Sequence, residues 1–296
     1  MVQMRVTDSS ITTRVLANLQ RNIARGGQIQ EQLSSGKQIS RPSDSPTGAI
    51  SSMQLRGESR QNDQYTRNAD DGLGWLGAID DTLNDSMGRI SKARELAIQG
   101  LNSGISTPAS REALAVELEN IKDGLIGLAN VTYLNRPVFG GTTTGRTAYD
   151  ASGAYQGDAG TVSRTVGSNA QVRVNANGPE VFGTGDTQLF AVLQGMADSL
   201  RANDPAALSA GLNKLVDAGD VVKSALADVG ARYNRVSQMR DTAQDRLVTL
   251  TSQISDFEDI DLPKTIMEMQ LQQTSYEAAL AATAKVIQPS LIDYLR

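Results

Sequence analysis

The side chains that could carry out chemistry in this 296-residue chain are carboxylates, amines and hydroxyls, because the sequence contains no cysteine and no histidine. Thiolate nucleophiles, disulfides, Cys/His zinc sites and a histidine general base are therefore excluded. The densest carboxylate cluster is DFEDID at residues 256–261. It resembles a metal-binding run by residue type, but it lacks the glycine turn of a calcium loop. Helix capping and solvation explain these acids better, so we predict no metal, no cofactor and no enzymatic activity.

Other reactive groups are sparse. Asn68, Asp70 and Asp71 are predicted to lie on a solvated helix face. A carbohydrate or peptide site needs several exposed aromatic rings or two converging carboxylates. The middle of the chain offers few of either, and its candidates are Tyr149, Tyr155, Phe182, Asp150, Asp158, Glu180 and Asp186. A binding module or enzyme in this segment therefore remains only an alternative interpretation.

Charge and hydropathy narrow the class of partner. The net charge is −5 and the basic residues are scattered, whereas nucleic-acid-binding domains usually carry a clustered basic face. No segment approaches the roughly 20 apolar residues that cross a bilayer.

The start of the chain, MVQMRVTDSS, lacks the pattern of a cleaved secretory signal. We expect no nucleic acid, no membrane insertion, and any export to use a route without a cleaved signal; translation could start at Met1 or Met4.

Helical periodicity dominates four long segments of the chain. The most regular is 205–258, where apolar residues recur every three or four positions, which is typical of a coiled-coil seam. At 1.5 Å per residue it predicts a rod about 80 Å long. Two partner helices are predicted at 46–100 and at 108–130. The second follows Thr107-Pro108, a capping residue and a proline suited to the first turn.

Residues 135–186 have a different character, rich in Gly, Thr, Asn and Val. They predict short strands such as Thr161–Val166 and Gln171–Val174, joined by a tight turn. The predicted fold is mainly α with a small β insert, a long antiparallel helical bundle or coiled-coil rod whose terminal helices pair. Its three expected domains are paired terminal helices (1–45 plus 259–296), a helical rod (46–134 plus 187–258) and a small β-rich insert (135–186).

The two ends each carry an apolar stripe and opposite charge. Residues 1–60 hold eight basic and four acidic residues, a net +4, and residues 256–296 hold three basic and seven acidic residues, a net −4. Helices with such stripes and charges can pair antiparallel. A two-helix pair buries one narrow face, so these ends should stay loose in a single molecule and order among neighbouring copies. The predicted assembly interface is Ile11, Val15, Leu19, Ile23, Ile29, Leu33, Leu262, Ile266, Met269, Tyr276, Leu280, Ile287, Leu291 and Tyr294.

The stretch EQLSSGKQISRPSDSPTGAI, residues 31–50, predicts an elbow between two helices. Gly36 can adopt the left-handed conformation that ends a helix. Ser45 can cap the next helix, and Pro46 suits its first position. The elbow should join the assembling end to the rod.

Several blocks make the chain resemble the flagellins and the flagellar hook–filament junction proteins related to them. The blocks are QIQEQLSSGKQISRPSDSPTGA, YTRNADDGLGWL, ARELAIQGLNS, LANVTYLNRPVFGGT and QLQQTSYEAALAATAKVIQPSLIDYL. The resemblance covers roughly the first 140 and the last 90 residues and leaves the β-rich segment unmatched. SRPSDSPTGA and PSLIDYL are more similar to the junction proteins than to flagellin. Ser45 departs from the Asp that is frequent in the family, but both residues can cap a helix.

The resemblance implies a structural subunit of the bacterial flagellum, extracellular and exported by the flagellar type III apparatus. Its implied partners are copies of itself in a ring, the hook-side junction protein, flagellin and the filament cap, and an export chaperone. It also implies that the terminal helices form the inner layer and order on assembly. Flagellin, the filament subunit itself, is the alternative within this structural class.

Overall fold

Two of the helices predicted from the sequence begin at residues whose side chains cap them. At the start of helix α3 (Pro108–Ala129), the Thr107 hydroxyl accepts a hydrogen bond from the Ser110 N–H at 3.2 Å. At the start of α6 (Pro205–Glu258), the Asp204 carboxylate accepts from two backbone N–H groups. These side chains bond the N–H groups that a helix leaves free in its first turn. The predicted positions of both helix starts are therefore confirmed.

The computed structural model describes residues 2–102, 107–145 and 147–287, with side chains over 13–102, 107–145 and 147–284. Helix makes up 75% and strand 6%, which confirms the predicted fold class. The remaining elements are α1 (Val2–Ser35), α2 (Pro46–Leu101), β1 (Thr132–Tyr133), β2 (Arg136–Pro137), β3 (Ser163–Gly167), β4 (Ala170–Arg173), α4 (Gly178–Phe182), the 3₁₀ helix η2 (Gly185–Thr187), α5 (Leu189–Ala202) and α7 (Leu262–Ile287). Within the described ranges, no helix combines the length and apolarity needed to cross a bilayer.

The chain divides into two compact units, one of residues 1–60 and 247–296 and the other of residues 61–246. The long helices α2 and α6 each contribute to both units. This division differs in its boundaries from the three parts expected from the sequence. The separation into terminal pair, rod and insert stays a prediction.

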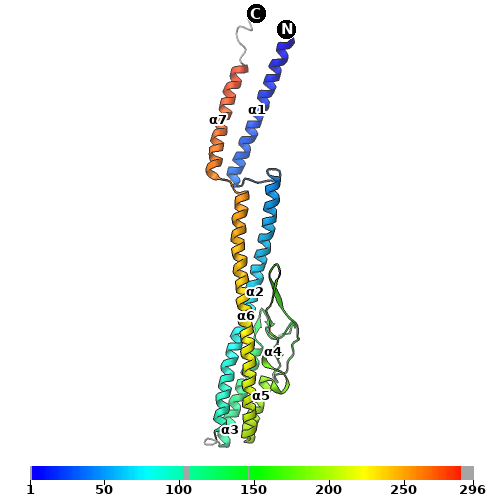
Figure 1. Ribbon diagram of the computed structural model, residues 1–296, viewed down its shortest axis with the longest axis vertical. Helices are drawn as coiled ribbons and strands as arrows, with labels where there is room; N and C mark the ends of the chain where they lie inside the picture. Colours follow the sequence, from blue (N-terminus) through cyan, green and yellow to red (C-terminus); the bar gives the residue numbers. More distant parts are fainter. Residues whose placement is uncertain (1, 103–106, 146, 288–296) are drawn as a thin grey trace. The chain divides into compact units, whose positions relative to one another are not determined.

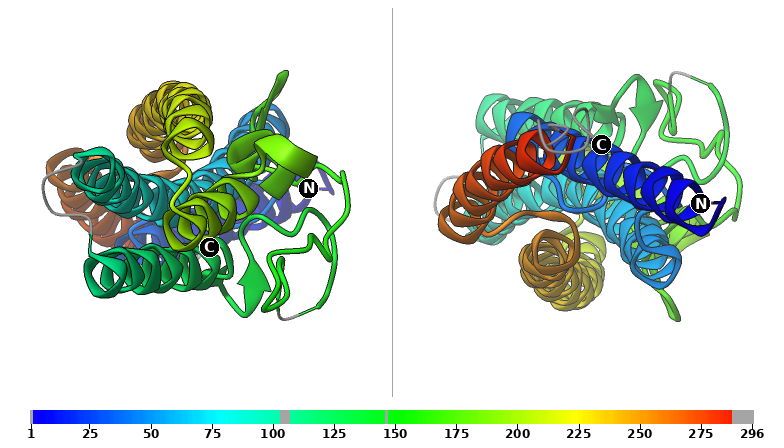
Figure 2. Two further views of the ribbon diagram at one scale, coloured as in Figure 1. Left: turned by 90° about the horizontal axis from the view of Figure 1, so that it is seen from below. Right: turned by 90° about the horizontal axis from the view of Figure 1, so that it is seen from above.

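The unit of residues 61–246 is built around one apolar core. Parts of α2 and α6 lie beside α3 and α5, as the end-on view of Figure 2 shows for the lower part of the molecule. Buried residues from these four helices form a continuous cluster that includes Leu76, Leu83, Leu118, Leu193 and Val222. Helix α5 was not predicted as a separate element, because its fourteen residues are too few to show a long stripe. It packs along α3 and closes the core (Figure 1).

The β-rich segment packs on this core through aromatic rings. The centroid of the Phe182 ring lies 5.2 Å from that of Phe139, 5.8 Å from that of Tyr149 and 5.5 Å from that of Phe190. All four residues are at most 1% exposed. Rings at such spacings and angles attract one another beyond the burial of their surface. Tyr149 and Phe182, considered above as binding residues, therefore belong to the core.

The strands form two antiparallel pairs, β1 with β2 and β3 with β4. The second pair overlaps the predicted strands, but β3 is one residue shorter and lies nearer the turn, and β4 begins and ends one residue earlier. Asn68 and Asp71 of α2 hold β3: the Asn68 amide donates to the Thr165 carbonyl at 2.8 Å, and Arg164 donates to Asp71 at 2.6 Å. The prediction of a solvated face was wrong for these two residues, because the sequence alone does not show which segment covers a helix.

The β1–β2 turn contains a strained residue. Leu134 has φ of +47° and is 71% exposed, and a left-handed backbone costs an L-residue about 1–2 kcal/mol. We expect Leu134→Gly to raise the free energy of unfolding by about 0.5–1 kcal/mol, since glycine removes the strain but loses more chain entropy on folding. Urea unfolding of the variant measures this. Leu134→Ala, which keeps the strain, is the control, and equal stability of the two variants would contradict the explanation.

Candidate assembly site at the paired terminal helices

Helices α1 and α7 lie side by side and run antiparallel (Figures 1 and 2). The contact is an apolar seam that includes a polar link, in which the Gln272 amide donates to the Asn22 carbonyl at 2.9 Å. Helix α1 is continuous through Gly26 and Gly27, although these glycines interrupt its predicted stripe. The pair buries little, because Ile29 of α1 and Thr265 of α7 are its only residues below 9% exposure in the described side chains.

The predicted interface residues fall into three groups. Ile29 is buried at 5% exposure, and Val15, Leu19, Leu33, Met269 and Tyr276 are half-buried along the seam. Ile23, Leu262, Ile266 and Leu280 remain 41–55% exposed. The side chains of Ile11 and Ile287, together with Leu291 and Tyr294, lie outside the described residues. The predicted interface residues are therefore divided: some pack in the contact between α1 and α7, and others remain exposed to solvent beside it.

Three further apolar residues were missed by the sequence reasoning. Leu16 is 55% exposed on α1, and Met267 and Leu271 are 63% and 68% exposed on α7. At about 100° per residue, Met267 and Leu271 share a face that lies roughly opposite Met269 and Tyr276. The predicted interface was found by stepping four and then three residues along the chain, which follows a single face of the helix. Residues on the opposite face, such as Met267 and Leu271, are therefore not selected. The four-residue spacing of Met267 and Leu271 was the signal that could have revealed it.

A groove runs along one flank of the pair. Its volume is about 330 Å³, and Ile23, Gly26, Met269, Gln272 and Tyr276 line most of it. Gly26 contributes no side chain, and its nearest neighbour across the seam is the Gln272 side chain. The groove and the outward stripe of α7 give the pair apolar surface on two sides. Apolar patches of this kind mark interaction sites.

At the elbow, two chain segments cross as a short ladder. Gly36 has φ of +70°, and its N–H closes the last turn of α1 on the Gln32 carbonyl at 2.8 Å. The Gln38 N–H donates to the Glu258 carbonyl at 2.6 Å, and the Ile260 N–H donates to the Gly36 carbonyl at 3.1 Å. A side chain at position 36 would strain this backbone. Ser45 accepts from the Gly48 N–H at 3.2 Å, and Pro46 is the first residue of α2.

The elbow also holds charged groups that the sequence did not reveal. The Glu258 carboxylate accepts from the Ser52 hydroxyl and from Arg56 at 2.6 Å, and it lies 3.4 Å from the Lys37 amine. Lys37 also pairs with Asp259 at 2.5 Å. Capping was expected for the DFEDID acids, and Asp261 does accept from the Lys264 N–H at 3.2 Å. Glu258 and Asp259 instead join segments more than 200 residues apart. Among the described residues, no group of three or more acidic residues is arranged to hold a metal ion.

These ion pairs predict how the elbow responds to pH. Burial would raise the pKa of Glu258, but hydrogen bonds from Arg56 and Ser52 outweigh it and lower the pKa below 4.5. The Lys37 hydrogen bond likewise lowers the pKa of Asp259 below 3.8. Carboxyls with a lowered native pKa add stability above their unfolded pKa, and this is lost as the pH falls through the native value. We expect the stability difference between the native chain and Glu258→Gln to be constant from about pH 7 to 5 and to shrink below about pH 4.

Urea unfolding across this pH range measures the difference. Glu31→Gln is the control, because Glu31 also pairs with a basic residue of the link, Arg41, but is exposed. A difference between the native chain and Glu258→Gln that stays the same down to pH 3 would contradict the assignment.

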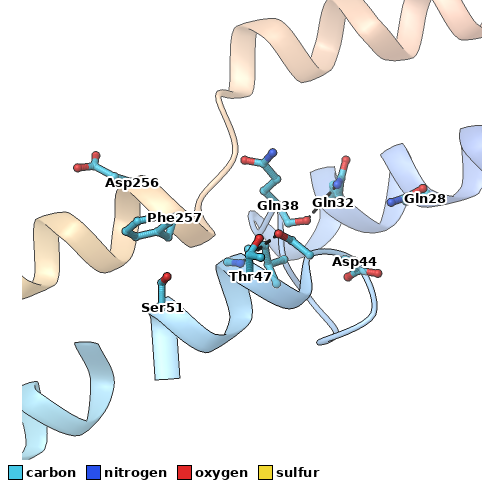
Figure 3. Close-up of a pocket in the computed structure, with 11 residues that line it drawn as sticks. Gln28, Gln32, Gln38, Asp44, Thr47, Ser51, Asp256 and Phe257 are labelled. Atoms are coloured by element: carbon cyan, nitrogen blue, oxygen red, sulfur yellow. Dashed lines mark hydrogen bonds between the residues drawn. The ribbon is translucent and has the colours of Figure 1, made fainter. Parts of the chain in front are cut away.

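A polar pocket of about 520 Å³ adjoins the elbow (Figure 3). Gln28 and Gln32 face it from α1, Thr47 and Ser51 from α2, and Phe257 from α6. The Gln32 amide donates to the Gln38 carbonyl at 3.2 Å. The carboxylates of Asp44 and Asp256 also line this pocket. The chemistry of the pocket suits hydrogen bonding.

The fold and this surface define a class of protein, a mainly helical chain whose helices α1 and α7 pair and leave apolar side chains exposed. The family described as bacterial flagellin N-terminal helical region matches residues 7–144, and that described as bacterial flagellin C-terminal helical region matches residues 212–295. Together these ranges cover most of the chain. The chain belongs to the flagellin family, as its resemblance predicted.

Individual relatives include both kinds of protein considered above. The flagellar hook-associated protein 3 of Escherichia coli is 26% identical over 277 residues, covering 85% of this chain and 87% of the relative. The flagellin of Bacillus subtilis is 25% identical over 305 residues, covering 96% and 97%. The crystal structure of FlgL from Bacillus cereus has a TM-score of 0.60 at 20% identity, covering 68% of this chain and 99% of that structure. This last likeness concerns the fold.

Proposed function

We propose that this chain is the subunit that joins the hook-side junction protein to the flagellin filament, and that it assembles through α1 and α7. The observation that carries the proposal is the apolar surface left open on the pair, with Ile23, Met267 and Leu271 each more than half exposed. Burying one such side chain contributes about 1.5–3 kcal/mol. Copies packed around one another would bury these residues together. The similarity to hook-associated protein 3 supports the junction position.

The remaining features of the proposal follow from the same family. The partners are neighbouring copies in a ring, the hook-side junction protein, flagellin and the filament cap, and an export chaperone. The location is the extracellular flagellum, reached by type III export without a cleaved signal. Among the predicted interface residues, those that the pair leaves exposed, Ile23, Leu262, Ile266 and Leu280, would form the contact with neighbours. The chain acts by binding and does not catalyse a reaction.

The experiment that tests assembly through the ends is hydrogen exchange on the dilute protein and on the protein bound to isolated hooks. We expect amides of α1 and α7 to exchange faster than those of the 61–246 core in the free protein, and to become protected on binding, because neighbours cover the pair. Protection of both helices in the free protein equal to that of the core would contradict ordering on assembly.

Flagellin itself is the second candidate, favoured by the almost complete coverage of the Bacillus subtilis flagellin. Polymerisation separates the two. A filament subunit extends long filaments from purified protein, whereas a junction subunit binds the hook and stops. Long filaments grown from this protein alone would reject the junction assignment.

A further inference from the structure

The elbow is bonded more extensively than a flexible link requires. Beyond the two backbone hydrogen bonds between its crossing segments, it has one carboxylate shared by three donors. Glu258, at the end of α6, is 4% exposed. It bonds Ser52 and Arg56 of α2 and faces Lys37 of the segment that follows α1. One side chain therefore joins α6, α2 and the first crossing segment.

We propose that Glu258 is a latch that holds the α1–α7 pair at one angle to the adjoining ends of α2 and α6, residues 46–60 and 247–258. Its value for assembly rests on the proposed function, since a pair presented at one angle can meet its neighbours without first losing the freedom to swing. The pair is joined to α2 by residues 36–45 and to α6 by residues 259–261. Without such bonds, backbone rotation in these two links could change its angle.

Glu258 and Asp259 differ in environment although they are adjacent. The Lys37–Asp259 pair is open to water, with both side chains at least 40% exposed, so solvent screens it. The Glu258 side chain is 6% exposed, and the charged groups that face it are Lys37 from the link and Arg56 from α2. Lys37 also pairs with Asp259. Removing the charge of Glu258 leaves these cations and Ser52 with an amide that cannot accept from all three. Glu258 is therefore a positioning residue, and Asp259 is the matched control.

The test is a distance measurement by pulsed electron spin resonance on the dilute full chain. The chain has no cysteine, so Ala24→Cys on α1 and Met53→Cys on α2, both exposed, take up spin labels uniquely. We expect a single narrow distance at pH 7 in the otherwise native chain and in Asp259→Asn. We expect that narrow peak to be lost in Glu258→Gln and in Arg56→Met, with the helix content by circular dichroism unchanged.

Arg56→Met keeps the test decisive if Glu258→Gln fails to fold, because the Arg56 side chain is 57% exposed and its loss leaves no cavity. A broad distance in the native chain, or a narrow one in both the Glu258 and Arg56 variants, would overturn the latch. Loss of the peak in Asp259→Asn as well would also overturn it, since the exposed pair would then hold the elbow. The spin-label distance reports the angle of the pair while α1 is folded, whereas faster hydrogen exchange reports brief openings that the distance does not detect. A pair that opens often can therefore still keep one angle, and the latch can fail or hold independently of ordering on hooks.

Discussion

Replacing Phe182 with alanine is expected to lower the free energy of unfolding of the 61–246 unit by about 3–5 kcal/mol, the range for aromatic truncation in a packed core. Phe182 is 1% exposed and contacts three other rings, two edge-to-face and one stacked. These rings attach the β-rich segment to α5. Their surroundings are close-packed, so the cavity left by the deletion cannot collapse fully. This loss is a large part of the stability of a typical domain.

Urea unfolding followed by the fluorescence of Trp75 measures this loss, because Trp75 is the single tryptophan and is buried in the same unit. Tyr233→Ala is the matched control, the truncation of an aromatic side chain that lies in the same unit and is 40% exposed. We expect less than about 1 kcal/mol from the control, since little apolar surface is returned to water. Equal losses from the two variants would show that the aromatic cluster does not hold the segment.

Placing aspartate at both Met267 and Leu271 is expected to weaken binding to hooks more than 100-fold while leaving the fold unchanged. Burial of two large apolar side chains contributes about 3–6 kcal/mol at each contact, and each 1.4 kcal/mol corresponds to a factor of ten in affinity. Both side chains are exposed in the free chain, so the isolated protein loses no packing. The variant should keep its helix content and its unfolding midpoint.

Sedimentation with isolated hooks measures the binding. The matched control is Gln20→Asp with Ala24→Asp, which adds the same charge at the same four-residue spacing on exposed positions of α1. If the control binds as weakly as the α7 variant, added charge alone explains the loss. If both bind like the native chain, the outward stripe of α7 is not part of the assembly surface.

The two predictions address different parts of the molecule for a physical reason. The 61–246 unit buries its large side chains within one chain, so its substitutions act on stability. The α1–α7 pair leaves large apolar side chains in water, so substitutions there act on association. Long, weakly covered helices are marginal by themselves, and the apolar side chains exposed on this pair are the basis on which we propose that it associates with neighbours.

The sequence by itself determined the positions of the long helices, because apolar periodicity and capping residues are local signals. Thr107-Pro108, Ser45-Pro46 and Gly36 stand where helices begin or end in the structure. Local blocks also determined the family, since their resemblance spans both ends of the chain. None of these conclusions required knowledge of which segments meet.

Only the tertiary structure decided which polar groups pair across long separations. Glu258 reads as one of four acids in a short run, yet it bonds Ser52 and Arg56, and Asp71 reads as a solvated helix residue, yet it bonds Arg164. The sequence spacing could show the second apolar stripe of α7, but only the structure shows that Met267 and Leu271 of this stripe stay exposed. A hydrogen bond depends on positions within about 3 Å, and periodicity along the chain carries no information at that precision about residues far apart.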